Sequence, residues 1–221
     1  MKLPLCLTIA CVLCLPVLAA PSKKPMPRDG DVFHFEPNSF KYINCDAEFR
    51  DPKDQKWPNF FYGRPGGGTH KFDDTTPTAQ LSVVFDKMCQ PKGDQSRRVL
   101  GDLSKPDAPP PVTFTITSMS PFRTETIESS GRKGPEKKEV ELSELNATLQ
   151  VGGRKVNVKP KATFSYHADK NGTINRCTIE ARFVVKAGDL GLTSMPPTSE
   201  VQVRMTINGS PNQAAPPKNK R

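Results

Sequence analysis

The stretch Cys177–Leu192, CTIEARFVVKAGDLGL, decides the fold class. Every second residue from Cys177 to Val185 is apolar, and the positions between them begin with Thr178, Glu180 and Arg182. A period of two is that of a β-strand with one buried face and one face in water. The alternation stops at Gly188-Asp189-Leu190-Gly191-Leu192, which does not have the glycine spacing of a phosphate-binding loop and is not followed by a helical period. We therefore interpret this segment as a strand end at which Leu190 and Leu192 plug or rim the structure, rather than as a catalytic loop around Asp189.

The same alternation recurs along the rest of the chain. It predicts strands in 33–49, 79–88, 112–119, 142–151, 155–166 and 201–207. A Gly152-Gly153 loop and a turn at Asp169–Gly172 predict three consecutive antiparallel strands over 145–185, and Gly66–Gly68 predicts another tight turn. Seven or more one-sided strands form a sandwich or an up-and-down barrel, and consecutive hairpins favour the barrel. The expected fold is thus all-β, an antiparallel up-and-down, lipocalin-like barrel with long loops.

The two ends of the chain differ in composition from the β region. Met1–Ala20 has a short basic start, an apolar run and a small-residue cleavage site after Ala19 or Ala20, which predicts a secretory signal peptide. A membrane anchor would need about 20 apolar residues without the interrupting Pro4 and Pro16. We expect 21–30 to be a flexible lead-in, 31–207 the β domain and 208–221 a disordered basic tail. The predicted location is secreted or periplasmic.

Three cysteines, Cys45, Cys89 and Cys177, remain after removal of the predicted signal peptide. Their long spacings match neither a metal-binding nor a redox motif. Cys45 and Cys177 lie in alternating apolar series, which favours small buried thiols over a disulfide. A single disulfide remains an alternative, and the sequence does not select a pair.

The formal net charge is +9, but the basic residues are scattered along the chain and no nucleic-acid-binding module is visible. This pattern predicts no nucleic-acid partner and at most weak association with anionic surfaces. The histidines are His34, His70 and His167, and we expect His34 and His167 on the solvent face. No nucleophile or metal-binding motif is present. We therefore expect no enzyme activity, no cofactor and no metal site.

Three motifs, in this order, resemble the YceI-like family of secreted, mainly bacterial, lipocalin-like barrels. They are PPVTFTITSM from Pro110, ATLQVGGRKVNVKPKATF from Ala147 and IEARFVVKAGDLGL from Ile179. The chain departs from the family pattern in its unusually charged loop at Ser129–Lys138. The resemblance implies a protein that holds an amphiphile with a long apolar tail, such as a polyisoprenoid or other lipid, inside the barrel.

The inward-facing apolar series supplies the candidate ligand-binding residues. We predict that the barrel lining includes Phe114, Ile116, Leu149, Phe164, Ile179, Ala181 and Phe183. The alternative is a secreted β-sandwich that acts as an interaction module without a small-molecule ligand. Room beside Ala147, Ala162 and Ala181 would favour a ligand-binding barrel, whereas large side chains on every inward row would favour the alternative.

Overall fold

The computed structural model describes residues 26–36, 45–50, 59–89, 112–131, 134–193 and 195–211, so the predicted signal peptide lies outside the described residues. The regular structure in these ranges is entirely β. The strands are β1 (Val32–His34), β2 (Cys45–Arg50), β3 (Asn59–Lys71), β4 (Thr78–Cys89), β5 (Val112–Met119), β6 (Arg123–Gly131), β7 (Gly134–Val151), β8 (Arg154–Val158), β9 (Lys161–Ala168), β10 (Ile174–Lys186) and β11 (Glu200–Pro211). No helix in these ranges has the length and apolar character needed to cross a bilayer.

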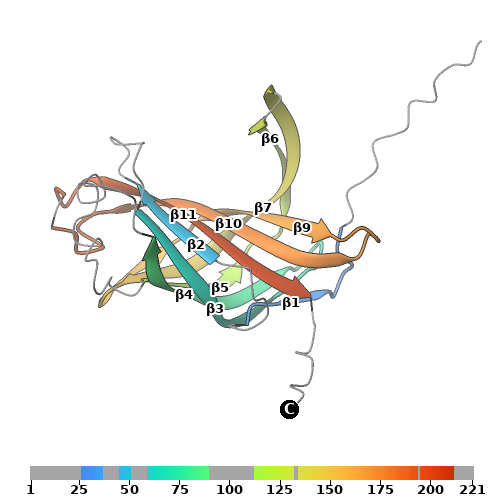
Figure 1. The fold of residues 1–221 in the computed structure, drawn as a ribbon, viewed down its shortest axis with the longest axis horizontal. Helices are drawn as coiled ribbons and strands as arrows, with labels where there is room; N and C mark the ends of the chain where they lie inside the picture. The colour runs from blue at the N-terminus through green and yellow to red at the C-terminus, as the bar shows by residue number, and fades with distance from the viewer. Residues whose placement is uncertain are drawn as a thin grey trace, which may run out of the picture.

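The strands close into a ring by antiparallel pairing (Figure 1). The order around the wall is β2–β3–β4–β5–β7–β9–β10–β11, and β11 pairs back onto β2. β1 occupies the same place in the wall as β2, because it also pairs with β11 and β3. These pairings give eight strand positions around the wall. The predicted antiparallel barrel is confirmed.

The alternating apolar residues fill the inside of this ring. Fully buried phenylalanines come from five different strands or their ends, among them Phe33, Phe49, Phe61, Phe85 and Phe114. Burial of each such side chain contributes roughly 1.5–3 kcal/mol to folding, so the inward rows dominate the stability of the wall. Leu190 and Leu192 are buried in the same core, in agreement with their predicted role at the end of a strand.

The glycine turns are confirmed at two of the three predicted places. β7 and β8 are joined through Gly152, which has φ 58°, and β9 and β10 are joined through a turn in which Gly172 has φ 81°. The prediction of a turn at Gly66–Gly68 was wrong, because these residues lie within β3 at a β-bulge opposite Ser82. Gly68 has φ 133°, and a side chain on it would collide with the backbone of Gln80 and Leu81. Glycine is needed there for close strand contact rather than for chain reversal.

The charged segment that was expected to be a loop is instead part of a hairpin. β6 pairs with the first half of β7, from Arg123 opposite Leu142 to Gly131 opposite Gly134. In Figure 1 this ribbon projects away from the barrel. The apolar alternation did not reveal it, because a projecting ribbon has no face that must be buried in the core.

Both predicted domain boundaries need correction. Gly30 donates a backbone hydrogen bond to Phe72 (2.9 Å), and the backbone N–H of Asp74 donates to the Asp29 carboxylate (3.1 Å). Residues 26–30 of the expected flexible lead-in are therefore attached to the end of the barrel. β11 also continues past Ile207 to Pro211, because Gly209 pairs with Cys177 and the last residues pair with β1. The rest of the expected tail, 212–221, lies outside the described residues.

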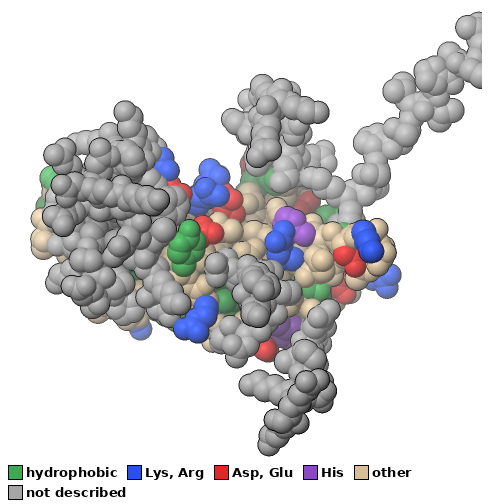
Figure 2. Space-filling view, viewed as in Figure 1, with side chains coloured by type: hydrophobic (Ala, Val, Ile, Leu, Met, Phe, Trp, Pro, Cys, Tyr) green, Lys and Arg blue, Asp and Glu red, His purple; other side chains and the backbone are tan. Residues whose placement is uncertain are grey.

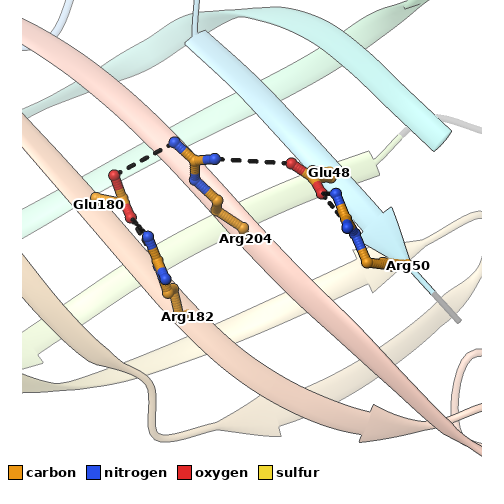
Figure 3. A network of polar contacts seen from close by, with 5 residues as sticks. All are labelled: Glu48, Arg50, Glu180, Arg182 and Arg204. Carbon is orange, nitrogen blue, oxygen red and sulfur yellow. Dashed lines mark hydrogen bonds and ion pairs between the residues drawn. The ribbon is translucent and has the colours of Figure 1, made fainter. Parts of the chain in front are cut away.

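A ladder of ion pairs crosses the outer wall where β2, β11 and β10 are neighbours (Figure 3). Arg204 on β11 lies between Glu48 of β2 (3.8 Å) and Glu180 of β10 (3.4 Å). Arg50 and Arg182 each pair with the glutamate on their own strand, at 2.5 Å. The two glutamates thus offset the repulsion between Arg182 and Arg204, which lie directly opposite one another. The pair between Arg182 and Glu180 is the most exposed of the four, and exposed pairs contribute about 0–1 kcal/mol each.

Candidate functional site

The predicted lining residues come together in the barrel interior. Phe114 lies opposite Leu149, and Ile179 lies opposite Phe164, so four of the seven form two cross-strand pairs. Phe114, Ile116, Leu149, Phe164, Ile179 and Ala181 all have exposed fractions of 2% or less. Phe183 differs because it is only half-buried, although its ring stacks on that of Phe114 with centroids 5.8 Å apart.

The partial exposure of Phe183 coincides with a gap in the wall. β8 and β9 both pair with β7 and occupy one strand position, interrupted at Lys159-Pro160. Proline has no backbone N–H to donate to a ladder, which favours such a break. β9 pairs with β10 only as far as Lys161 opposite Arg182. Beyond that point β8 pairs only with β7, and we call the space between Arg154–Val158 and Phe183–Lys186 the β8–β10 slot.

A pocket of about 560 Å³ occupies the β8–β10 slot. Its inner part is formed by apolar side chains that face the barrel interior, namely Val156, Val158, Phe183 and Val185. Its outer part is formed by charged and exposed side chains. These are Lys159, Lys161, Arg182, Val184, Lys186, Asp189 and Glu200. The pocket therefore leads from a charged outer rim to apolar side chains of the core.

The Gly188–Leu192 turn closes one end of the slot. The Arg154 guanidinium reaches across from β8 and donates to the carbonyl oxygen of Gly188 (3.4 Å). Gly191 has φ 71°, and a side chain on it would collide with Arg154. The predicted strand end is thus a turn that packs against the neighbouring strand.

A second pocket, of about 480 Å³, lies on the other side of β10, beside the ion-pair ladder. It is lined by Glu48, Arg50, Arg182, Phe183, Val184, Gln202, Val203 and Arg204. Val184 is 51% exposed and borders both pockets, as do Phe183 and Arg182. β10 is therefore the shared wall between two hollows on the outer surface.

A buried polar pair lies toward the opposite end of β10, among aromatic rings. His70 on β3 has no exposed surface, and its ring contacts those of Phe33, Phe164, Phe122 and Tyr166. Its Nδ1–H donates to the Thr78 carbonyl oxygen, and its Nε2 accepts from the Tyr166 hydroxyl, both at 2.9 Å. Sequence reasoning missed this pair. The two-residue spacing from His70 to Phe72 could have placed His70 on the inward face.

Burial controls the ionisation of the groups at this end. Desolvation lowers the pKa of His70 to about 4, although its hydrogen bond to Thr78 partly opposes the shift. Desolvation also raises the pKa of Tyr166 and of Cys177, which lie opposite one another on β9 and β10. Burial raises the pKa of Cys45 to about 11. All four groups are consequently neutral at physiological pH.

The cysteines and the charged residues occupy positions that can be set against their predicted roles. Cys45 and Cys177 are free and buried, which confirms the interpretation of them as small core residues. The side chain of Cys89 lies outside the described residues. Within the described ranges, no three histidine, cysteine or acidic side chains cluster in a way that could hold a metal ion. Cationic side chains on the face shown in Figure 2 are interspersed with anionic and apolar ones.

The fold has counterparts among solved structures. Burkholderia cenocepacia BcnA is 12% identical and matches over 74% of this chain and 95% of its own, with a TM-score of 0.46. A polyisoprenoid-binding domain from Saccharophagus degradans is 10% identical over 83% of this chain and 99% of its own, with a TM-score of 0.43. A Campylobacter jejuni YceI protein is 14% identical over 66% of this chain and 81% of its own, with a TM-score of 0.42. No protein-family model and no curated protein matches the sequence. The YceI proteins, the family that the strand motifs resemble, are thus among the solved structures to which this chain is similar.

Proposed function

We propose that this chain is a secreted barrel protein that binds an amphiphile with a long apolar tail, such as a polyisoprenoid or another lipid. The observation that carries the proposal is the position of Phe183. Its ring stacks on buried Phe114 on one side and borders the pocket in the β8–β10 slot on the other. A tail that enters the slot therefore meets a continuous apolar path from the outer surface to the inward rows.

The energetics favour a long tail over a small polar ligand. Burial of each CH₂ group stabilises a complex by roughly 0.8 kcal/mol, so about ten such groups give roughly 8 kcal/mol before the costs of association are subtracted. The inward side chains already fill the region around Phe114, so a tail must displace side chains in order to advance. Phe183 is the best placed to move, because it is the one predicted lining residue that is not fully buried.

The close packing of the interior also favours a second candidate function. Ala147, Ala162 and Ala181, beside which a ligand was expected to need room, are themselves buried, with at most 6% exposed. A protein whose interior is filled in this way can act as an interaction module without a small-molecule ligand. The two candidate functions differ in whether an apolar molecule is bound when the protein is isolated.

The direct test is mass spectrometry of the protein purified from its native source without detergent. An intact complex in native spectra, and a lipid in the organic extract of the same sample, are expected. Fluorescent long-chain probes should also bind the stripped protein at micromolar concentration. Folded protein that yields no lipid and binds no probe would support the interaction module instead.

Phe183→Ala tests the route of entry. It should change the affinity for a long-chain probe at least several-fold while the barrel remains folded, because the ring lies at the slot and is half-buried. Phe72→Ala is the matched control, because Phe72 is a buried phenylalanine that stacks on Phe122 and meets Tyr166 edge-to-face at the other end of the barrel. Equal effects of the two substitutions on affinity would mean that probe binding reports only general stability.

Secretion is supported by the apolar run and small-residue cleavage site of Met1–Ala20. The expected mature protein begins after Ala19 or Ala20. N-terminal sequencing of the protein recovered outside the cell tests this directly. A chain that still begins at Met1 would contradict secretion by signal cleavage.

A further inference from the structure

We propose that the amphiphile bound at the β8–β10 slot carries a negatively charged headgroup, which Lys159, Lys161 and Lys186 hold at the rim. This inference rests on the proposed function and adds the chemical class of the ligand. Three observations lead to it: the gap in the hydrogen-bonded ladder, the change in side-chain chemistry across the pocket, and the absence of ion-pair partners for the three lysines among the described residues.

The gap exposes the interior through the side of the wall. Along most of the ring, ladder hydrogen bonds join neighbouring strands, but β8 has no such ladder with β10. The pocket in this gap touches Val158 and Val185, which belong to the buried core. A molecule in the pocket therefore contacts core side chains without passing through either end of the barrel.

The chemistry across the pocket matches that of an amphiphile. Inward-facing valines and Phe183 form its inner part, and the exposed lysines lie at its outer edge. A single-chain lipid with its tail inward would place its headgroup among the lysines. Ammonium groups on flexible side chains can adjust to a carboxylate or a phosphate.

The charges at the rim favour an anion. Four cations and two anions border the pocket, the anions being Asp189 and Glu200. Arg182 is already paired with Glu180, at 2.5 Å. Lys159, Lys161 and Lys186 make no ion pair in the described part of the chain, so their charges remain available to a ligand. Lys186 lies opposite Glu200 on β11 without forming a pair within 4.0 Å.

The test compares two fluorescent C18 probes that differ only in their headgroups, cis-parinaric acid and its alcohol, with the full mature protein at pH 7.5. The acid should bind about tenfold more tightly than the alcohol, and this preference should weaken as salt is raised from 50 to 500 mM. Lys159→Gln, Lys161→Gln and Lys186→Gln combined should abolish the preference and leave the affinity for the alcohol within about twofold. Dodecyl phosphate and laurate as competitors distinguish a phosphate from a carboxylate headgroup.

The control removes the same amount of charge elsewhere. Lys71→Gln, Arg123→Gln and Lys170→Gln combined change three exposed cations that border neither pocket. This control should keep the preference for the acid, and circular dichroism should show both triple variants folded. Equal binding of acid and alcohol by the unmodified protein, or equal losses in both variants, would overturn the headgroup inference and leave the proposed function intact. If neither probe binds the unmodified protein, both the headgroup inference and the proposed function are overturned.

Discussion

Mild acid should destabilise this barrel through His70, whose ring is buried toward one end of the barrel. The ring is neutral in the folded protein, where burial lowers its pKa from 6.5 to about 4. In the unfolded chain the same imidazole takes up a proton near its ordinary pKa, so the unfolded state binds more protons as the pH falls below 6.5. The contribution of neutral His70 is fully present above pH 6.5 and is lost progressively down to about pH 4.

The expected size of the effect follows from the two pKa values. The free energy of unfolding should fall by about 2 kcal/mol between pH 7.5 and pH 5, and by about 3 kcal/mol once the pH is below 4. The hydroxyl that faces the His70 ring belongs to neutral Tyr166, and the titratable groups that act on Tyr166 are Cys177 on β10 and Glu141 on β7. Asp46, on the outer wall, has a pKa raised by burial and acts in the opposite direction as its carboxyl is protonated.

Urea unfolding monitored by circular dichroism at several pH values between 7.5 and 5 measures the effect. His70→Gln is the control, because it removes the titrating ring and keeps a side chain that can donate to Thr78. The variant should lose about 2 kcal/mol less than the unmodified protein over that pH range. NMR titration of the His70 ring gives an independent measurement in the unmodified protein. A His70 signal that titrates near pH 6.5, or identical pH dependence of the two proteins, would refute the reasoning.

Three further predictions concern the buried pair, the bulge in β3 and the end of β11. Tyr166→Phe should lower the free energy of unfolding at pH 7.5 by about 1–3 kcal/mol in urea titrations, because it leaves the buried His70 Nε2 without a donor; an unchanged midpoint would contradict that hydrogen bond. Gly68→Ala should lower the melting temperature far more than Gly67→Ala, because both positions have positive φ but only a Cβ added at Gly68 would collide with β4; equal losses would mean that backbone conformation alone matters. Truncation after Ile207 should lower the melting temperature relative to truncation after Pro211, because it removes the pairs of β11 with Cys177 and with β1; equal melting temperatures would show that these pairs do not contribute.

The sequence was most informative where a strand has one face in the core and the other in water. Cys177–Val185 is such a strand, and its inward series forms part of the barrel interior as predicted. The β6–β7 ribbon was missed because it projects from the barrel, so no apolar period marks it. The glycines of β3 were misinterpreted as a turn because a bulge and a turn both require conformations that glycine adopts easily.

The candidate site could be predicted only in part. Phe183 was identified as a lining residue from its place in an alternating series. Its exposure depends on the missing ladder between β8 and β10, which is a property of strand pairing and not of any single segment. Lys159 and Lys186 are distant in the sequence, and only the folded wall brings them to the rim of one pocket. His70 was not placed in the interior, since its neighbours in β3 include three glycines that obscure the alternation.

The seam between β2 and β11 also determines when the barrel can be completed. Glu48 lies opposite Arg204, so one of the first strands of the chain must pair with the last. Contacts between residues so distant in sequence carry a large loop-closure cost and slow folding. Until β11 is in place, β2 and β10 each present an open edge, and Arg204 does not yet bridge Glu48 and Glu180. A chain that emerges N-terminus first during its synthesis therefore remains an unsealed, aggregation-prone sheet until β11 is available to close it.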